Sequence, residues 1–303
     1  MKDWLKLLRP FTLLPPALGM ATGALAGLGA RGASFETEIL LRILRGALMA
    51  ALLNAASNVL NQIHDLDQDR VNKPARPIPA GRITVAAARR LTGLLYLLAI
   101  GLSWTLEAGA GRECFVIVLF TVVVTWAYSA PPLRLRRYGW RANLTVAIPR
   151  GLLLKVAGWS TVAPVFHDPE PWYLGSIFFL FLLGATSTKD FADVAGDRMA
   201  GVRNLPIRLG TERAIRAISP FFVFPWLLFP LATLGPRPLL SARPWGLDLL
   251  GGIGLVYGLY LVRLLRRDPE ALVRSGENHP AWGHMYRLMM LAQLGSAAVY
   301  LRF

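Results

Sequence analysis

Long apolar segments separated by short polar loops run along the whole chain. Segments of membrane-spanning length fall at residues 11–30, 39–62, 86–106, 114–130, 142–163, 172–188, 214–235, 245–264 and 282–301. A helix of about 20 apolar residues is long enough to cross the hydrocarbon core of a bilayer. The pattern therefore predicts an all-α integral membrane protein, a bundle of nine transmembrane helices that forms one domain over residues 1–303.

The cationic residues are divided unevenly between the two ends of this predicted bundle. One set of loops contains most of the lysines and arginines, and the opposite loops contain only Arg31, Arg112, Arg237 and Arg243. Cytoplasmic loops of membrane proteins are enriched in Lys and Arg. The sequence thus predicts a cell (inner) membrane location with the N-terminus and the cation-rich loops in the cytoplasm.

Composition supports the membrane assignment and changes the meaning of the charge. The chain is 54% hydrophobic and 17% charged, and its net charge is +15. Such a basic balance is also typical of nucleic-acid-binding proteins, but these cations lie in short loops between spans, where membrane topology explains them. We therefore expect membrane lipid and no nucleic acid as a partner. The single Cys114 excludes an internal disulfide and a cysteine metal cluster.

Two polar stretches interrupt the apolar pattern at predicted cytoplasmic helix ends. The first follows the second span and contains Asn61, Asp65 and Asp69 at intervals of four, which places their oxygen atoms in one column on a helix. Prolines that follow Lys73 and flank Arg76 should end this helix and hold both cations in an extended loop.

The second polar stretch follows the sixth predicted span. Asp190, Asp193 and Asp197 follow i, i+3, i+7 spacing, which again places them on one helix face. Both stretches contain Asp-x-x-x-Asp-Arg, followed by cations and a proline. This weak internal repeat predicts two facing halves around one site, with the loop from Tyr128 to Arg137 on the same side of the membrane.

The residue types in these stretches point to a site for a metal ion and a diphosphate. Clustered carboxylates repel one another and need cations. Because the proposed ligands are all oxygen donors, the expected ion is Mg²⁺, which completes its coordination with water and substrate phosphate. An apolar bundle behind such a site suits a lipid tail. Candidate cations for the remaining phosphate oxygens are Lys73, Arg76, Arg136, Arg137, Lys189 and Arg203.

Four motifs together suggest a known family. The first runs from Asn61 through Asp69-Arg-Val-Asn-Lys-Pro-x-Arg-Pro-Ile-Pro-x-Gly81, and the second is Lys189-Asp190-x-x-Asp193-x-x-x-Asp197-Arg. The loop between them reads Tyr128-Ser-x-Pro-Pro-Leu-Arg-Leu-Arg-Arg, and Arg9-Pro10 opens the first span. This arrangement resembles the UbiA superfamily of intramembrane prenyltransferases over nearly the whole chain.

The resemblance implies Mg²⁺-dependent transfer of a prenyl group from a polyprenyl diphosphate to a small lipophilic acceptor. Neutralising the leaving diphosphate would let the allylic C–O bond ionise, and the acceptor would attack the resulting cation in a dry pocket. The resemblance also implies two metal sites, one made by Asn61, Asp65 and Asp69 and the other by Asp190, Asp193 and Asp197. Asp65, Asp69, Asp190 and Asp193 are the expected catalytic residues, and Arg70 and Tyr128 join the expected diphosphate-binding set.

The acceptor signals conflict. Gln62 stands where many family members have Asp, and this substitution is similar to the homogentisate prenyltransferase branch. The prolines around Arg76 and the Tyr128 loop more closely resemble the chlorophyll synthase and geranylgeranylglyceryl phosphate synthase branches. We prefer an aromatic or quinone-precursor acceptor, with a chlorophyllide-like acceptor or a glycerol phosphate lipid as alternatives.

Arg150 is the expected acceptor-binding residue. It lies about 12 Å into the fifth predicted span at ~1.5 Å per residue, and a cation at that depth is a candidate functional group. It could bind an acceptor carboxylate or a diphosphate oxygen, or it could extend toward the membrane surface.

Two other functions fit parts of the pattern. A membrane terpene cyclase would ionise the same donor without an acceptor. A cation-coupled transporter also contains repeated halves with acidic residues, but transport sites usually lie near the middle of the membrane, whereas these acids lie at one face.

Overall fold

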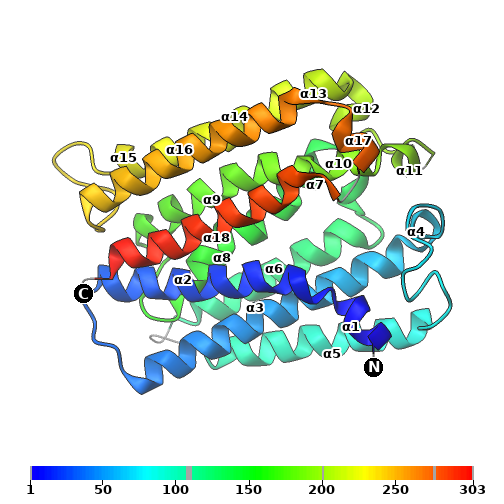
Figure 1. Ribbon diagram of the computed structural model, residues 1–303. Helices are drawn as coiled ribbons and strands as arrows, with labels where there is room; N and C mark the ends of the chain where they lie inside the picture. The colour runs from blue at the N-terminus through cyan, green and yellow to red at the C-terminus, as the bar shows by residue number, and fades with distance from the viewer. Residues whose placement is uncertain (1, 107–110, 200, 276–277, 302–303) are drawn as a thin grey trace.

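The chain folds as an all-helical bundle in the computed structural model, which describes residues 2–106, 111–199, 201–275 and 278–301 (Figure 1). The elements of its first half are α1 (Lys2–Leu8), η1 (Pro10–Leu13), α2 (Leu14–Ala30), α3 (Thr37–His64), α4 (Leu66–Asn72), α5 (Val85–Trp104), α6 (Glu113–Ser129), η2 (Leu135–Arg137), α7 (Trp140–Ala147), η3 (Ile148–Leu153) and α8 (Leu154–Ser160).

The second half of the described chain is helical as well. Its elements are α9 (Pro169–Ser187), α10 (Lys189–Ala192), α11 (Val194–Met199), α12 (Leu205–Leu209), α13 (Thr211–Ile218), α14 (Pro220–Val223), η4 (Phe224–Leu227), α15 (Leu228–Leu231), α16 (Pro244–Arg267), α17 (Ala271–Ser275) and α18 (Pro280–Tyr300). The predicted fold class, an all-α membrane bundle, is confirmed.

Among the described residues, six helices are long and apolar enough to cross a membrane. These are Lys2–Ala30, Thr37–His64, Val85–Trp104, Pro169–Ala192, Thr211–Leu231 and Pro244–Arg267, and α6 is a shorter apolar helix. Leu97 and Val256, on helices that lie at the outside of the bundle, are 69% and 68% exposed. Large apolar side chains that face outward suit a lipid environment. The number of nine spans stays a prediction.

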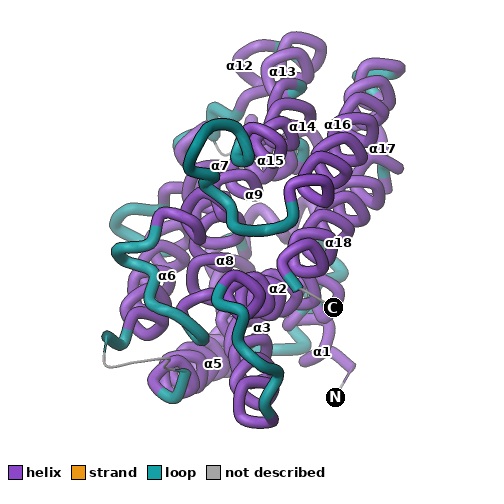
Figure 2. The backbone as a smooth tube through the Cα atoms, turned by 90° about the vertical axis from the view of Figure 1, so that its left-hand side faces the viewer, coloured by secondary structure: helices purple, strands orange, loops and turns teal. Residues whose placement is uncertain are grey.

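The long helices run side by side (Figures 1 and 2), and the short helices α4, α10, α11, α12 and α17 gather at one end (Figure 1). The N-terminus lies toward the end that carries α4, α10, α11 and α17, and the C-terminus lies at the other end (Figure 1). Inside the bundle, α2 crosses α8 very closely, because a Cβ atom at Gly158 would lie 2.2 Å from the Met20 carbonyl oxygen. Small residues at a helix crossing allow such an approach in membrane proteins.

Three buried amides of α3 hold the N-terminal segment against the bundle. Asn54 donates to the Thr12 carbonyl at 3.0 Å, Asn58 to the Leu8 carbonyl at 3.1 Å and Gln62 to the Leu7 carbonyl at 2.8 Å. These amides recur every fourth residue, so they form a column on α3. The segment bends at Arg9, whose φ of 57° is left-handed. Gln62 is therefore part of a structural column on α3, and its own contact supports the end of α1.

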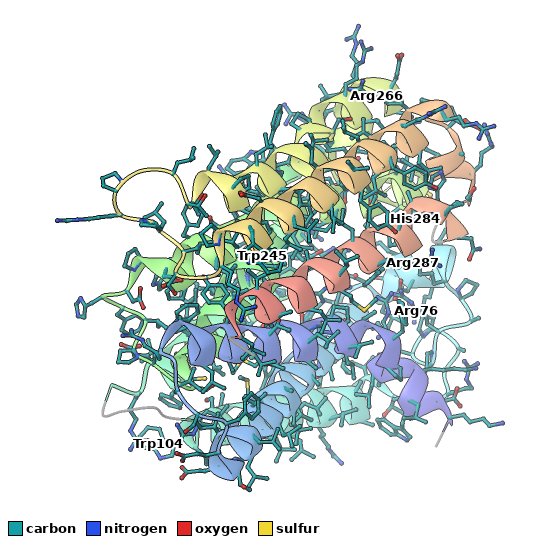
Figure 3. All side chains as sticks on the ribbon, turned by 60° about the vertical axis from the view of Figure 1, so that its left-hand side comes forward. Arg76, Trp104, Trp245, Arg266, His284 and Arg287 are labelled. Atoms are coloured by element: carbon teal, nitrogen blue, oxygen red, sulfur yellow. The ribbon has the colours of Figure 1, made fainter. Side chains whose placement is uncertain are left out.

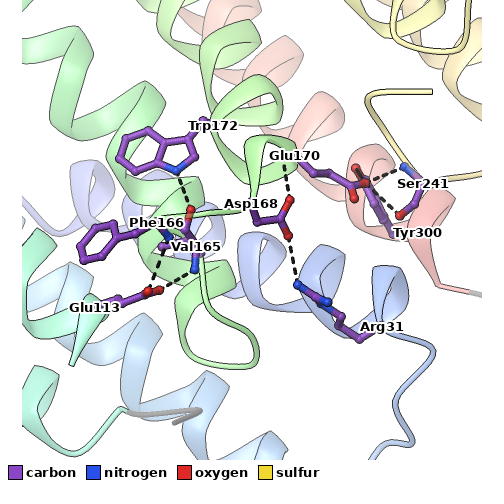
Figure 4. Close-up of polar contacts among 9 residues, drawn as sticks. All are labelled: Arg31, Glu113, Val165, Phe166, Asp168, Glu170, Trp172, Ser241 and Tyr300. Carbon is purple, nitrogen blue, oxygen red and sulfur yellow. Dashed lines mark hydrogen bonds and ion pairs between the residues drawn. The ribbon is translucent and has the colours of Figure 1, made fainter. Parts of the chain in front are cut away.

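At the end opposite α4, acidic side chains tie loops together (Figure 4). Glu113 accepts from the backbone N–H of Val165 at 2.5 Å, and Asp168 forms an ion pair with Arg31 at 3.1 Å. Glu170 accepts from the Tyr300 hydroxyl at 2.7 Å and from the Ser241 N–H at 2.6 Å. These acids therefore hold together segments that lie far apart in the sequence, at the end of the bundle opposite the two aspartate motifs.

Candidate functional site

The two acidic motifs fold into the same unit, a long helix that breaks at an aspartate and continues as a short helix. Asp65 separates α3 from α4, and Asp193 separates α10 from α11. Their backbone angles are nearly equal, at φ −99° and ψ 8° for Asp65 and φ −102° and ψ 6° for Asp193. The prediction of one uninterrupted helical column in each motif is wrong at these two residues, whereas the predicted end of the first helix before Pro74 is confirmed.

The aspartates of the first motif are buried and paired with arginines. Asp65 forms an ion pair with Arg136 of η2, and Asp69 accepts from Arg76 Nη1 at 2.8 Å and 2.6 Å through its two oxygens. The side chains of Asp65 and Asp69 are only 7% and 8% exposed. A buried carboxylate needs such a partner, because removing it from water is costly.

The aspartates of the second motif have weaker and more varied partners. Asp193 lies 3.5 Å from the Lys73 ammonium of the first motif. Asp190 accepts from the Asn143 amide at 3.3 Å, and Asp197 accepts from the Asn204 amide at 2.8 Å. The Lys73–Asp193 pair joins the two motifs directly. The predicted convergence of the two stretches on one end of the bundle is therefore confirmed.

Arg136 lies between the two motifs. Burial lowers its pKa, and the negative fields of Asp197, Asp193 and Asp190 act in the opposite direction. Burial also raises the pKa of Asp197, against the hydrogen bond from Asn204. Arg136 thus contacts the first motif through Asp65 and neutralises part of the charge of the second.

Of the other predicted phosphate-binding residues, two line the central cavity and three are exposed at the surface. Lys189 donates to the Tyr128 hydroxyl at 3.4 Å, and both side chains line the central cavity. Arg137 and Arg203 are exposed on the loops. Arg70 is not brought to the cluster, because it points to the surface and pairs with Asp67 at 2.9 Å. The placement of Arg70 therefore does not support a diphosphate-binding role.

A cavity of about 260 Å³ lies inside the bundle beneath this cluster. At one end its wall contains Asn61, Tyr128, Asn143, Lys189 and Asp190. Farther along the same helices the wall becomes apolar, with Met49, Val118, Leu153, Ala157 and Phe181. Asn61 and Met49 are both on α3, about 18 Å apart along the axis at ~1.5 Å per residue. The cavity is thus polar at the motif end and apolar in its depth.

Asn61 places an amide oxygen at the motif end of the cavity. Its Oδ1 atom is buried and has no hydrogen-bond partner among the described residues. In that part of the chain, no three His, Cys, Asp or Glu side chains are grouped closely enough to hold a metal ion. The motif aspartates instead have individual cation or amide partners. The donor set of one orphaned amide oxygen and five carboxylates nevertheless fits a hard cation such as Mg²⁺.

Several cavity residues were not identified from the sequence. Asn143 lines the cavity and donates to Asp190, whereas Asn204 donates to Asp197 outside the cavity wall. Arg9, directly before η1, and Trp282 and Tyr286 of α18 also line the cavity. The only sequence signal was Arg9-Pro10 at the start of the first span.

Arg150, which the sequence did single out, lines the cavity from a π-helical turn. Such turns are frequent at functional sites, and here Pro149 and Gly151 flank the arginine.

A membrane-embedded helix bundle whose cavity has an ionic mouth and an apolar depth is suited to a lipid-like substrate with an anionic head. The description "UbiA prenyltransferase family" matches residues 14–275 of this chain. The chain therefore belongs to that family and is a membrane prenyltransferase, as the resemblance predicted.

The relatives have different products. The bacteriochlorophyll synthase 33 kDa chain of Cereibacter sphaeroides is 31% identical over 88% of this chain and 83% of its own length. The digeranylgeranylglyceryl phosphate synthase of Sulfurisphaera tokodaii is 28% identical over 78% and 79%, and the homogentisate phytyltransferase of Synechocystis is 28% identical over 69% and 68%.

Solved structures share the fold. A UbiA homologue from Archaeoglobus fulgidus bound to DMAPP and Mg²⁺ covers 98% of this chain and 99% of its own, with a TM-score of 0.73 and 21% identity. A digeranylgeranylglyceryl phosphate synthase covers 100% and 99%, with a TM-score of 0.71 and 22% identity.

Proposed function

We propose that this prenyltransferase moves a prenyl group from a polyprenyl diphosphate to a lipophilic acceptor that carries an acidic group, in a Mg²⁺-dependent reaction. The observation that carries the proposal is the gradient of the cavity, from Asn61 and Asp190 at its mouth to Met49 and Ala157 in its depth. A diphosphate suits the ionic end and an isoprenoid chain suits the apolar end.

The donor diphosphate would lie among the cations at the mouth. Lys189 and Tyr128 can donate to its oxygens from the cavity wall, and Lys73, Arg76 and Arg136 lie on the motif side. Arginine suits phosphate because its planar group offers paired donors. Arg137 and Arg203 are further candidates on the exposed loops.

The carboxylates suit a divalent metal. Asn61, Asp65 and Asp69 would hold one Mg²⁺, and Asp190, Asp193 and Asp197 would hold a second. When bound, Mg²⁺ supplies positive charge that stabilises the leaving diphosphate. Asp65 pairs with Arg136, which lies between the motifs, and Asp193 pairs with Lys73 of the first motif. These two ion pairs at the helix breaks would fix the spacing between the two groups of ligands.

The acidic group of the acceptor would bind near Arg150. Tyr286, Tyr128 and Arg9 act electrostatically on Arg150, and no carboxylate of the described residues forms an ion pair with it. The Trp282 Nε1 group is buried without a hydrogen-bond partner among the described residues, and it lines the same cavity. Two guanidinium groups and an unused donor favour an anion.

The class of acceptor follows from relatives and motifs together. The bacteriochlorophyll synthase chain, at 31% identity, supports a chlorophyllide-like acceptor, and the Gln62 motif supports an aromatic or quinone-precursor acid. A glycerol phosphate lipid is the third candidate, from the archaeal relative. All three carry an acidic group, so Arg150 has the same role in each case.

The test is a product assay on purified protein in detergent with Mg²⁺ and geranylgeranyl diphosphate. Separate reactions receive a chlorophyllide, homogentisate or geranylgeranylglyceryl phosphate, and mass spectrometry follows prenylated product while diphosphate release is measured. One prenylated acceptor supports the proposal and identifies the class. Release of diphosphate with only hydrocarbon or prenyl alcohol would favour a terpene cyclase, and no release with any chain length of donor would overturn the proposal.

The acceptor site has its own control within this assay. Arg150→Gln should raise the KM for the acidic acceptor about tenfold or more and leave the KM for the donor within twofold. A selective rise in the donor KM would instead assign Arg150 to the diphosphate.

We further propose that the motif end faces the cytoplasm of a cell membrane. The two termini lie at opposite ends of the bundle (Figure 1), and the cation-rich loops lie at the motif end. Cytoplasmic enrichment of Lys and Arg supports this orientation. Protease protection of N-terminal and C-terminal tags in sealed membrane vesicles tests it, with only the N-terminal tag expected on the cytoplasmic side.

A further inference from the structure

A polar cluster on the outer surface of the bundle is not used by the proposed reaction. His284 of α18 lies between two tyrosines of α16, with its Nδ1 atom 2.9 Å from the Tyr257 hydroxyl and its Nε2 atom 3.4 Å from the Tyr260 hydroxyl. The rings meet edge to face, with centroids 5.9 Å and 5.0 Å from that of His284. Both ring nitrogens therefore have partners, and the imidazole is fixed at the seam between the two helices.

Two arginines extend this cluster along the same helix faces. Arg263 is three residues after Tyr260, and Arg287 is three residues after His284, so each lies one turn away on its own helix. Figure 3 shows His284 and Arg287 beside each other on α18. Both arginines are exposed, and neither has an ion-pair partner among the described residues. Residues 249–267 and 280–300 contain no acid, so this seam is cationic.

The polar groups on the two antiparallel helices lie at matching distances from the helix ends at the motif end of the bundle. Helix α16 ends at Arg267, and Arg263 and Tyr260 lie about 6 Å and about 10 Å before that end at ~1.5 Å per residue. Helix α18 begins at Pro280, and His284 and Arg287 lie about 6 Å and about 10 Å inside it by the same rise. All four groups are therefore just below the membrane surface at the motif end, where long arginine side chains reach lipid phosphates.

We propose that the seam of Tyr257, Tyr260, Arg263, His284 and Arg287 binds the phosphate of an anionic phospholipid. The arginines pair with the phosphate, and the Tyr260 hydroxyl and the His284 ring frame it. The neighbouring exposed side chains Val256 and Leu259, 68% and 53% exposed, offer an apolar surface for acyl chains. Free phosphate has no acyl chain to use this surface. A second copy of the chain would bring the same positive charge to the seam, and like charges repel.

Lipid retention tests this proposal. The protein is reconstituted in nanodiscs that contain phosphatidylcholine and phosphatidylglycerol. Native mass spectrometry then counts the lipids that stay bound to the protein after it is released from the nanodisc. The double substitution Arg263→Gln with Arg287→Gln should weaken retention of phosphatidylglycerol about thirtyfold, since each arginine near an anionic lipid surface contributes roughly fivefold. Phosphatidylcholine retention should not change.

A matched control removes equal charge at equal depth elsewhere. Arg89 and Arg90 are exposed and lie near the start of α5, at the motif end, without a tyrosine–histidine cluster. The Arg89→Gln and Arg90→Gln pair should retain wild-type lipid binding. Equal losses in the two double variants would overturn the proposal in favour of general surface charge, and loss of a dimer in the mass spectra would assign the seam to self-association. His284→Leu, which removes the ring proposed to frame the phosphate and leaves both arginines in place, should also weaken binding and provides a second measurement.

Discussion

Asp65 and Asp193 occupy equivalent breaks in two copies of one structural unit, and each reaches a cation supplied by another segment. Asp65 pairs with Arg136 of η2, and Asp193 pairs with Lys73, which follows α4. Ion pairs of the aspartates at the two helix breaks therefore connect the two halves. Repeated halves that meet at one site are a common way to build a membrane active site.

Asp65→Asn and Asp193→Asn should each lower turnover by at least about a hundredfold, because removal of one charged group from such a site costs that much or more. The nearby Asp67 is a control, since its side chain is 93% exposed and forms a surface ion pair with Arg70. Asp67→Asn should keep turnover within about twofold, as surface ion pairs contribute little. The measurement is diphosphate release under saturating donor. An equal loss in Asp67→Asn would refute the assignment.

Substitutions at the neighbouring residues Gln62 and Asn61 should have different effects, one on stability and the other on turnover. Gln62→Ala removes a buried donor from the Leu7 carbonyl and should lower the free energy of unfolding by about 2 kcal/mol. Asn61→Ala removes an oxygen that has no hydrogen-bond partner among the described residues, so it should lower turnover with little effect on stability. Thermal unfolding in detergent and initial rates check the two effects. A gain of activity in Gln62→Asp would mean that position 62 faces the metal after all.

The depth of the cavity should set the preferred donor length. Ala157→Phe adds volume to the apolar end and should favour dimethylallyl diphosphate over geranylgeranyl diphosphate by about tenfold or more relative to wild type. Met49→Ala should shift the preference toward longer donors. The two substitutions should change the ratio of kcat/KM for the short donor to kcat/KM for the long donor in opposite directions. A loss of folded protein would lower both kcat/KM values and leave their ratio unchanged. Shifts of the same sign would show that the donor tail lies elsewhere.

His279 should make stability depend on pH. Its Nδ1 atom accepts from the Ala281 N–H at 3.2 Å at the start of α18, and burial lowers its pKa below the ordinary 6.5. The unfolded chain therefore takes up this proton at a higher pH than the folded protein does, so stability falls as the pH drops below about 6.5. His279→Asn keeps a capping group without a titrating ring. The difference in melting temperature between wild type and variant should grow between pH 7 and pH 5, and a constant difference would exclude this role.

The sequence predicted the bundle and most of the site because both depend on local patterns. Apolar run length marks the helices, and the spacing of Asp65, Asp69, Asp190 and Asp193 marks the site. The placement of Arg70 follows from its i, i+3 spacing to Asp67 on α4, which turns both side chains to the surface, but the family motif outweighed this local signal. Asn143 and Asn204 also escaped prediction, because an amide in a span or loop has no signature until its carboxylate partner is known.

The π-helical turn from Ile148 to Leu153 has a consequence for comparing family members. Such a turn accommodates one residue more than an α-helical turn, and each residue of an α-helix rotates the next by about 100°. A family member without this widened turn would be one residue shorter here. An ungapped alignment would then match Arg150 with a residue from a different face, so acceptor specificity is better inferred from superposed backbones than from aligned letters across this segment.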